Sequence, residues 1–288
     1  HAWRELHQRC VVHLNVDSTG ARGASDYSVL HATEDAAAFA ESVVADVTGQ
    51  RARGRRFSRA GDQSFWGAGV PSAFMSLSGL PKQDTELSRA MERLVGSAGF
   101  PWWWHTKDDT VDKIDADVLV LDTKVYLASA LRWLNAPVLP LDHARAAQGL
   151  IAELETLQAA AGARFDLAPV LVAARGLAEK LGRVAAALAA APEQQVDAIN
   201  RALMRLSRLL VPLAYTSGDR FTHDLALPIA PLAGLQRARE LPALDPDSDA
   251  FKFARAALVR ERNRAVHAID SAASVADELL SLEQVSRP

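Results

Sequence analysis

Cysteine is nearly absent from this sequence of 288 residues, in which Cys10 is the only one. A single cysteine cannot close a disulfide within the chain, so a small scaffold held together by disulfides is excluded. A zinc site built from four cysteine thiolates is excluded for the same reason. The cysteine content is compatible with either an oxidising or a reducing compartment.

Long hydrophobic runs and an excess of one charge are also missing. The apolar stretches, such as Leu209–Tyr215, fall far short of the roughly 18 residues that a membrane span needs, so we expect no span in this chain. The 32 basic and 35 acidic side chains leave a net charge of -3, which excludes a global positive field for nucleic acid or anionic lipid. The first residue is His1, and we interpret the start as truncated or processed, with any signal peptide lost.

The composition and length are those of a globular protein of two domains. Hydrophobic residues make up 49% and charged residues 23% of the chain, and a domain commonly holds about 150 residues. Short apolar runs alternate with helical patterns in the first half, which predicts strands at Cys10–Val16 and Pro71–Leu77 and helices at Ala36–Val47 and Glu86–Leu94. Residues 1–136 are therefore predicted to form part of an α/β domain with a mostly parallel sheet.

The second half has a helical pattern throughout. A helix at Ala116–Leu134 closes the first unit, and Pro137 and Pro140 mark the boundary. Apolar residues then recur at helical spacing in four segments, at about 142–162, 168–191, 193–215 and 247–280. Residues 137–288 are therefore predicted to form an all-α helical bundle. The proline-rich segment Ser217–Pro246 is predicted to be extended and to serve a surface or an interface.

Asp17 directly follows the first predicted strand. Ligands of α/β proteins bind at the carboxyl ends of strands, where a loop can present a carboxylate without breaking the sheet. The alternative is an aspartate that caps a turn by bonding Ser18 or Thr19. The local pattern alone leaves both interpretations open.

His105 follows three tryptophans and opens the segment HTKDDTVDKID. A histidine on a loop beside aromatic residues could be a metal ligand, with Asp109 or Thr110 accepting its second N–H. The alternative is a structural histidine near a helix start, where Asp109, Thr110 or Asp115 acts as an ordinary cap.

Three segments together resemble one family. VVHLNVDSTG, at residues 11–20, resembles the strand and aspartate of the co-catalytic zinc exopeptidases, which include zinc aminopeptidases, glutamate carboxypeptidase II and the transferrin receptor. GDQSF at 61–65 with GVP at 69–71 resembles that family's GSDHxPF…GIP stretch, and HTKDDTVDKID at 105–115 resembles its HTxxDTxDKI motif. The order and rough spacing agree, and the helical half is similar to the dimerisation domain of the carboxypeptidase and receptor branch.

The resemblance implies that Asp17 is a terminal ligand of one zinc ion and His105 of a second. In the family the two ions share a water molecule, whose proton a glutamate takes as general base. The substrate would be a peptide or an acylated amino acid, cleaved at one end. Trp104 stands where the family commonly presents an aromatic side chain to the substrate, and its role here is either pocket wall or core.

The resemblance also places Asp62 in the loop near the metals, where a helix N-cap is the alternative role. Gln63 stands where the family has a histidine, so an amide that cannot titrate replaces an imidazole. Arg220 and His223 in the proline-rich segment either reach a partner subunit's site or are plain surface residues.

The sequence departs from the family in its upstream ligands. The family's first metal histidine, bridging aspartate and paired glutamates precede the strand that ends at Asp17, whereas Glu5 is the sole acidic residue before Asp17 here. Each ion would then keep one protein ligand, fewer than the three of a catalytic zinc site. We therefore expect the chain to be either the C-terminal part of a two-zinc exopeptidase, inactive alone, or a catalytically silent relative used for binding and dimerisation.

Two further expectations concern partners and compartment. Truncating an α/β sheet exposes a strand edge and apolar faces, so we expect a homodimer or association with the protein's own upstream segment. The family is mostly exported, which favours a periplasmic or extracellular location.

Overall fold

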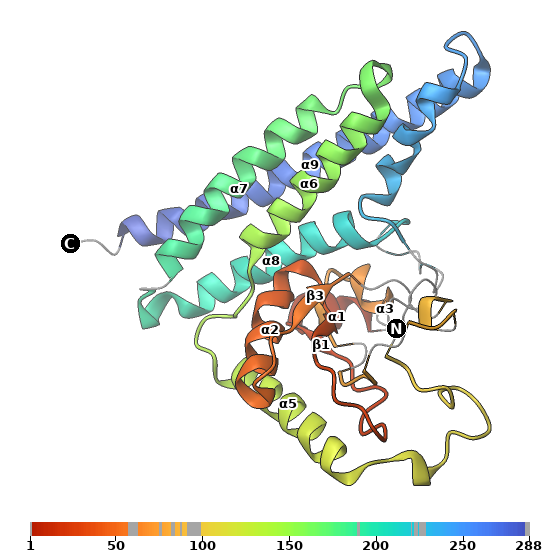
Figure 1. Ribbon diagram of the computed structural model, residues 1–288. Coiled ribbons are helices and arrows are strands. Elements are labelled where there is room, and N and C mark those ends of the chain that lie inside the picture. The colour runs from red at the N-terminus through yellow and green to blue at the C-terminus, as the bar shows by residue number, and fades with distance from the viewer. Residues whose placement is uncertain are drawn as a thin grey trace.

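The computed structural model describes residues 2–56, 63–74, 77–81, 84–86, 88–90, 99–188, 191–219, 221, 224 and 229–285. The described chain is mostly helical, with a small parallel sheet. Figure 1 shows the long helices of the second half running diagonally above a smaller lobe that contains the strands. None of the described helices combines the length and the hydrophobicity that a bilayer span requires.

The sheet of the smaller lobe consists of short parallel pairs. Its strands are β1 (His13–Leu14), β2 (Val29–His31), β3 (Arg53–Arg55) and β4 (Ser72–Ala73). β1 pairs with β4 and β2 with β3, and an isolated antiparallel bridge between Ala32 and Ala73 joins the two pairs. The two predicted strands are thus found in the right places but far shorter than expected. β4 ends where Phe74 takes a φ of 63°, outside the extended region. β1 pairs with β4 and is therefore equally short.

Helices cover this sheet and form the core of the lobe. They are α1 (Trp3–Arg9), α2 (Glu34–Thr48), α3 (Gln63–Trp66) and α5 (Ala116–Asn135), with a 3-10 turn at Val111–Lys113. α2 ends at Gly49, which takes the left-handed φ of 73°, and α5 begins at Asp115, whose carboxylate accepts from the amides of Asp117 and Val118. The predicted helix at Glu86–Leu94 falls largely outside the described residues.

The second half forms the predicted helical bundle. Its helices are α6 (His143–Ala161), α7 (Ala168–Leu188), α8 (Val196–Tyr215) and α9 (Asp249–Val285). Their apolar faces form one continuous core, separate from the core of the α/β lobe. The four helices predicted from periodicity are confirmed, with ends that differ by a few residues.

The segment between α8 and α9 differs from the extended chain that its prolines predict. The described part contains 3-10 helices at Ala233–Arg239 and Leu241–Ala243. Leu235 and Leu241 are buried in the bundle core. Proline lacks a backbone N–H donor, but it is tolerated at the first positions of a 3-10 turn, where no hydrogen bond within the turn needs that donor. The segment is therefore partly a component of the core.

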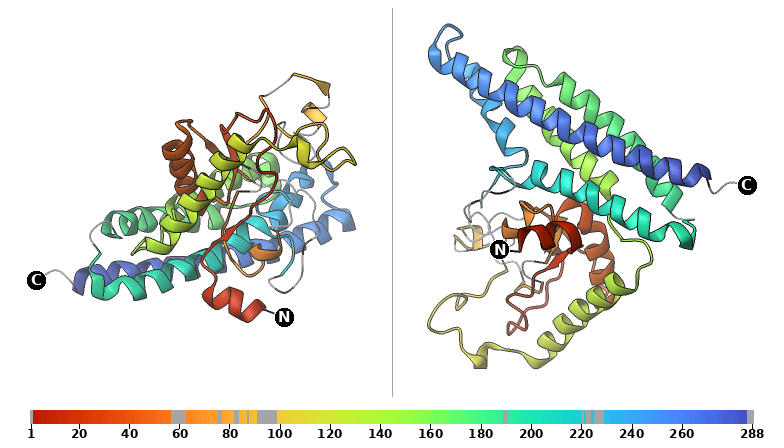
Figure 2. Two further views of the ribbon diagram at one scale, coloured as in Figure 1. Left: turned by 90° about the horizontal axis from the view of Figure 1, so that it is seen from below. Right: turned by 180° about the vertical axis from the view of Figure 1, so that it is seen from behind.

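Arg208 of α8 anchors the first helix to the bundle. Its guanidinium donates to the carbonyl oxygens of His7 at 2.6 Å, Leu6 at 3.4 Å and Cys10 at 2.5 Å. These carbonyls lie at the end of α1, where the helix leaves acceptors unpaired and its dipole favours a positive charge. The right-hand view of Figure 2 shows α8 running along the lobe beside α1.

Gly69 makes the same junction possible from the other side. Arg208 also donates to the Gly69 carbonyl at 2.6 Å. A Cβ on Gly69 would lie 2.5 Å from the Cα of Arg208, closer than real atoms approach, and Gly69 has a φ of 74°. The lobe and α8 can meet here only because residue 69 has no side chain.

We predict that Gly69→Ala lowers the free energy of unfolding by about 3 kcal/mol or more, because the methyl group overlaps the α8 backbone in addition to straining φ. Gly49→Ala is the matched control, since Gly49 has a φ of 73° and nothing within 4 Å of its added Cβ. We expect the control to cost about 1–2 kcal/mol, from backbone strain alone. Urea unfolding of both variants measures the difference, and equal losses would contradict this account of the junction.

Candidate functional site

Asp17 lies on an exposed turn three residues beyond β1. The next residue, Ser18, takes a left-handed φ of 53°, which turns the chain sharply. The hydroxyl of Ser18 donates to Oδ1 of Asp17 at 3.1 Å. The carboxylate is therefore presented at the carboxyl end of a strand and oriented by its neighbour.

Trp104 connects this turn to His105, which is 88 positions beyond Asp17 in the sequence. The indole Nε1 donates to the Ser18 hydroxyl at 3.0 Å. The His105 ring stacks on Trp104, with centroids 3.7 Å apart and planes 15° apart, and Phe100 also stacks on Trp104 at 4.2 Å. The structure thus brings the two sequence-predicted ligands to one region of the lobe.

His105 is exposed and takes a left-handed φ of 59°. This backbone conformation is uncommon for residues other than glycine and often occurs at functional sites. Trp104 is half-buried, so its ring serves both as packing for Phe100 and as a wall beside His105.

Asp109 and Thr110 are exposed on the loop after His105. The Asp109 amide donates to the Thr106 carbonyl at 3.2 Å, and the Thr110 hydroxyl bonds to Asp112. A hydrogen bond from Lys113, and a second one from Thr110, lower the pKa of Asp112 to about 2. These contacts shape the loop, and none of the hydrogen bonds found within the described chain joins Asp109 or Thr110 to the His105 ring.

Three other residues predicted from the sequence, Asp62, Arg220 and His223, lie outside the described residues. Gln63 begins α3. The donor types at Asp17 and His105, one carboxylate and one imidazole, both suit zinc. However, no group of three or more His, Cys, Asp or Glu side chains able to hold a metal ion occurs in the part of the chain that the structure describes.

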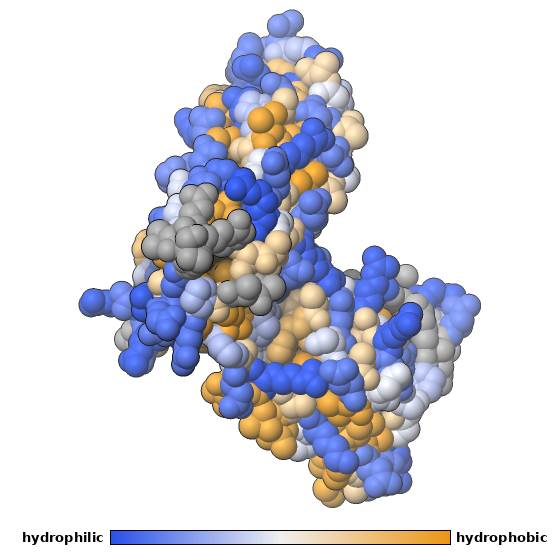
Figure 3. All heavy atoms as spheres, turned by 90° about the vertical axis from the view of Figure 1, so that its left-hand side faces the viewer, coloured by the Kyte–Doolittle hydropathy of each residue, from blue (hydrophilic) through white to orange (hydrophobic). Residues whose placement is uncertain are grey.

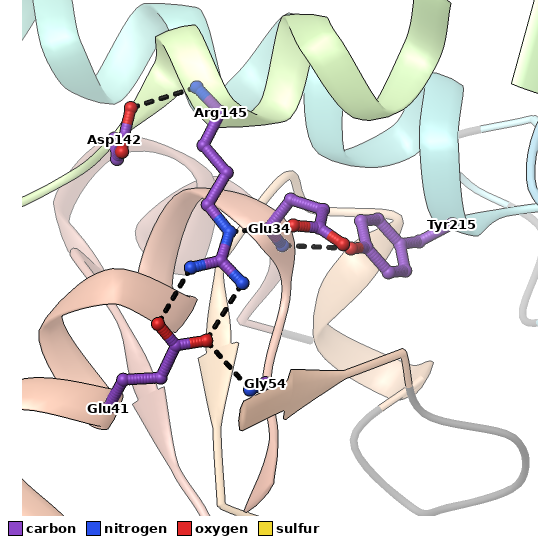
Figure 4. Close-up of polar contacts among 6 residues, drawn as sticks. All are labelled: Glu34, Glu41, Gly54, Asp142, Arg145 and Tyr215. Carbon is purple, nitrogen blue, oxygen red and sulfur yellow. Dashed lines mark hydrogen bonds and ion pairs between the residues drawn. The ribbon is translucent and has the colours of Figure 1, made fainter. Parts of the chain in front are cut away.

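A second polar cluster, which the sequence pattern did not reveal, joins the two halves of the molecule. Arg145 of α6 donates to Glu34 at 3.0 Å and, with two nitrogens, to Glu41 at 2.9 and 2.8 Å. Figure 4 shows the guanidinium between these two carboxylates of α2. Burial alone would raise the pKa of Glu41, but hydrogen bonds from Arg145 and the Gly54 amide outweigh it and lower the pKa. The one guanidinium bonds both carboxylates and so joins α6 to α2, which makes the cluster a structural link.

A third cluster is buried at the same junction and contains Asp35, Ser207 and His143. The Ser207 hydroxyl donates to Asp35 at 3.0 Å, so the 2.9 Å contact between Ser207 and Nε2 of His143 requires that Nε2 carries the proton. Burial lowers the pKa of His143 to about 4, so the imidazole is neutral near pH 7. A neutral imidazole protonated at Nε2 cannot take the serine proton there, so this order of residues is not a nucleophilic triad.

No family model matches this chain, and no curated protein matches it.

We predict that His143 makes the protein less stable in acid. The unfolded chain binds a proton near the ordinary histidine pKa of about 6.5, whereas the folded protein does so only near pH 4. The free energy of unfolding therefore falls as the pH drops through this window, by up to about 3 kcal/mol. Asp35, whose pKa is raised by burial, acts in the opposite direction, and Asp142 also lies beside the ring.

The measurement is urea unfolding between pH 7.5 and pH 4.5 for the wild type and for His143→Gln, which removes only the histidine contribution. His267→Gln, at an exposed position on α9, is the control and keeps the wild-type pH dependence. An unchanged pH dependence in His143→Gln would show that this imidazole is not held neutral.

Proposed function

We propose that this chain is the C-terminal part of a two-zinc exopeptidase that hydrolyses peptides, and that it supplies one ligand to each metal ion. One observation carries the proposal: Asp17 and His105, identified by separate motifs, are connected through Ser18 and Trp104. Such a connection is expected if both side chains serve one centre and has no counterpart in the alternative that each is an isolated cap.

The residues of this chain would orient the two ligands. The Ser18 hydroxyl fixes the Asp17 carboxylate, and the Trp104 ring fixes the plane of the His105 imidazole. Neighbours of this kind hold metal ligands in position and contribute to metal affinity. A bound pair of zinc ions supplies an activated water at neutral pH.

Each ion has one assigned ligand among the described residues, which contain no group of three or more side chains able to hold a metal ion and no assigned general base. A catalytic zinc site uses three protein ligands. The proposal therefore assigns the missing ligands and base to a segment upstream of Asp17 in the parent enzyme, and this chain alone is expected to be inactive. A peptide would be bound by the completed site, with Trp104 forming part of its wall.

We predict that the isolated chain binds Zn²⁺ weakly and that Asp17→Asn and His105→Gln each weaken that binding by about tenfold or more, because each removes one donor. Isothermal titration with Zn²⁺ measures the affinity. Asp108→Asn is the matched control, since it removes an exposed carboxylate from the same loop, and it is expected to bind like the wild type. Equal weakening in all three variants, or none in the first two, would contradict the assignment.

A catalytically inactive binding or dimerisation protein is the second candidate, favoured by an exposed apolar stripe on α5. Its members are Val120, Leu127, Leu131 and Leu134, whose exposed fractions are 52%, 56%, 50% and 82%. Their spacing places them on one face of the helix. On the face drawn in Figure 3, hydrophobic surface also gathers on the lower lobe, which contains α5. Exposed apolar surface of this kind marks interfaces.

We predict a homodimer at micromolar concentration that Leu131→Lys dissociates, because a charge in an apolar interface costs its desolvation. Light scattering measures the mass. Val172→Lys changes an exposed apolar residue on α7 and leaves the mass unchanged. A monodisperse wild-type monomer would remove the support that the stripe gives to self-association.

A further inference from the structure

A cavity of about 530 Å³ lies where the α/β lobe meets the helical bundle. It is lined by α2, by the connection between α5 and α6, by the first turn of α6, and by α7 and α8. Most of its wall is apolar, with Phe39, Leu139, Leu181 and Leu203 contributed by the different elements. Its volume falls in the range of small-molecule pockets, and such pockets occur preferentially between domains.

One residue of the wall carries a buried polar atom without a partner among the described residues. His143 lines the cavity and is 3% exposed, and its Nδ1 has no hydrogen-bond partner in the part of the chain that the structure describes. Because Nε2 carries the proton that is donated to Ser207, Nδ1 is an acceptor. A buried acceptor left unpaired costs free energy. A ligand that donates a hydrogen bond to this acceptor removes that cost and so binds more tightly.

The charges around the cavity select against anionic ligands. The polar residues of the wall are Ser42, Asp142 and the imidazole of His143. None of these described residues supplies a positive charge for a carboxylate or phosphate. The Asp142 carboxylate already accepts from the Arg145 amide at 2.8 Å, where it caps α6. Burying an unpaired charge in an apolar pocket is costly.

We propose that this cavity binds an uncharged, mostly apolar small molecule that carries one hydrogen-bond donor, with the donor directed at Nδ1 of His143. The site is separate from the Asp17 and His105 region and does not depend on metal binding. Ligand binding would stabilise the contact between the lobe and the bundle, because elements of both form the wall.

The test uses 2-naphthol, an apolar ring system with one hydroxyl donor, and the isolated chain. 2-Methoxynaphthalene is the matched probe, since it keeps the ring and the oxygen but cannot donate. We expect saturable binding of 2-naphthol in a fluorescence titration, with about fivefold or greater preference over the ether, the factor that one neutral hydrogen bond provides.

Two variants locate the binding. Ala185 lines the cavity and is exposed, so Ala185→Trp fills the space without replacing a core residue. Ala186 is its exposed neighbour on α7, outside the cavity wall, and Ala186→Trp is the control for a new tryptophan on this helix. We expect about tenfold weaker binding in Ala185→Trp and unchanged binding in Ala186→Trp, with the same circular dichroism and unfolding midpoint in both.

Absence of saturable binding by the wild type would overturn the proposal. Equal affinity in Ala185→Trp and the wild type would also overturn it, because the probe would then bind elsewhere. Equal affinity for 2-naphthol and 2-methoxynaphthalene would overturn the role of His143 as the acceptor.

Discussion

Arg145 of α6 donates three hydrogen bonds to two carboxylates of α2, and the arrangement of the two halves depends on this contact. The guanidinium is planar and bonds Glu41 with two nitrogens, so it fixes the rotation of α2 as well as its distance from α6. Glu34, about two turns before Glu41 on the helix, receives the third bond. Removing Arg145 would leave two carboxylates facing each other at a half-buried junction, which is costly.

The same contact positions elements that Arg145 does not touch. Glu41 accepts from the Gly54 amide at 2.7 Å and so holds β3 against α2. The Tyr215 hydroxyl accepts from the Glu34 amide at 2.9 Å and connects the end of α8 to the start of α2. The cavity beside His143 lies at this junction, so its shape depends on how α2 sits on the bundle. The Asp17 turn is held from the other side, through β1, β4 and the contact of Gly69 with Arg208.

The sequence predicted helices far better than strands, for a physical reason. A helix pairs its own backbone, so periodicity and caps such as Gly49 and Asp115 define its limits locally. A strand needs a partner, and the β-branched run at Cys10–Val16 contains no information about how short β4 is. Likewise, the prolines of Ser217–Pro246 indicate where a regular α-helix stops, but the 3-10 turns there follow from burial of Leu235 and Leu241 in the bundle.

Parts of the candidate site were also predictable and parts were not. Asp17 and His105 are predicted as ligands because each stands in a motif, and that role stays a prediction. Nothing local predicts the bond from Trp104 to Ser18 across 86 positions. His143 and Ser207 lie on amphipathic helices. In such a helix, the sequence does not distinguish one buried polar side chain from the exposed polar side chains of the opposite face. Their role became visible only when tertiary contacts placed Ser207 between Asp35 and His143.

The central functional claim is that Asp17 and His105 belong to one zinc centre that an upstream segment completes. The most direct measurement is the zinc content, by mass spectrometry, and the exopeptidase activity of the full-length gene product beside this 288-residue chain. We expect two zinc ions and activity in the full-length protein, and neither stoichiometric zinc nor activity in the chain alone, because its weakly bound zinc is lost during purification. No metal and no activity in either protein would contradict it and would mean that the fold serves binding.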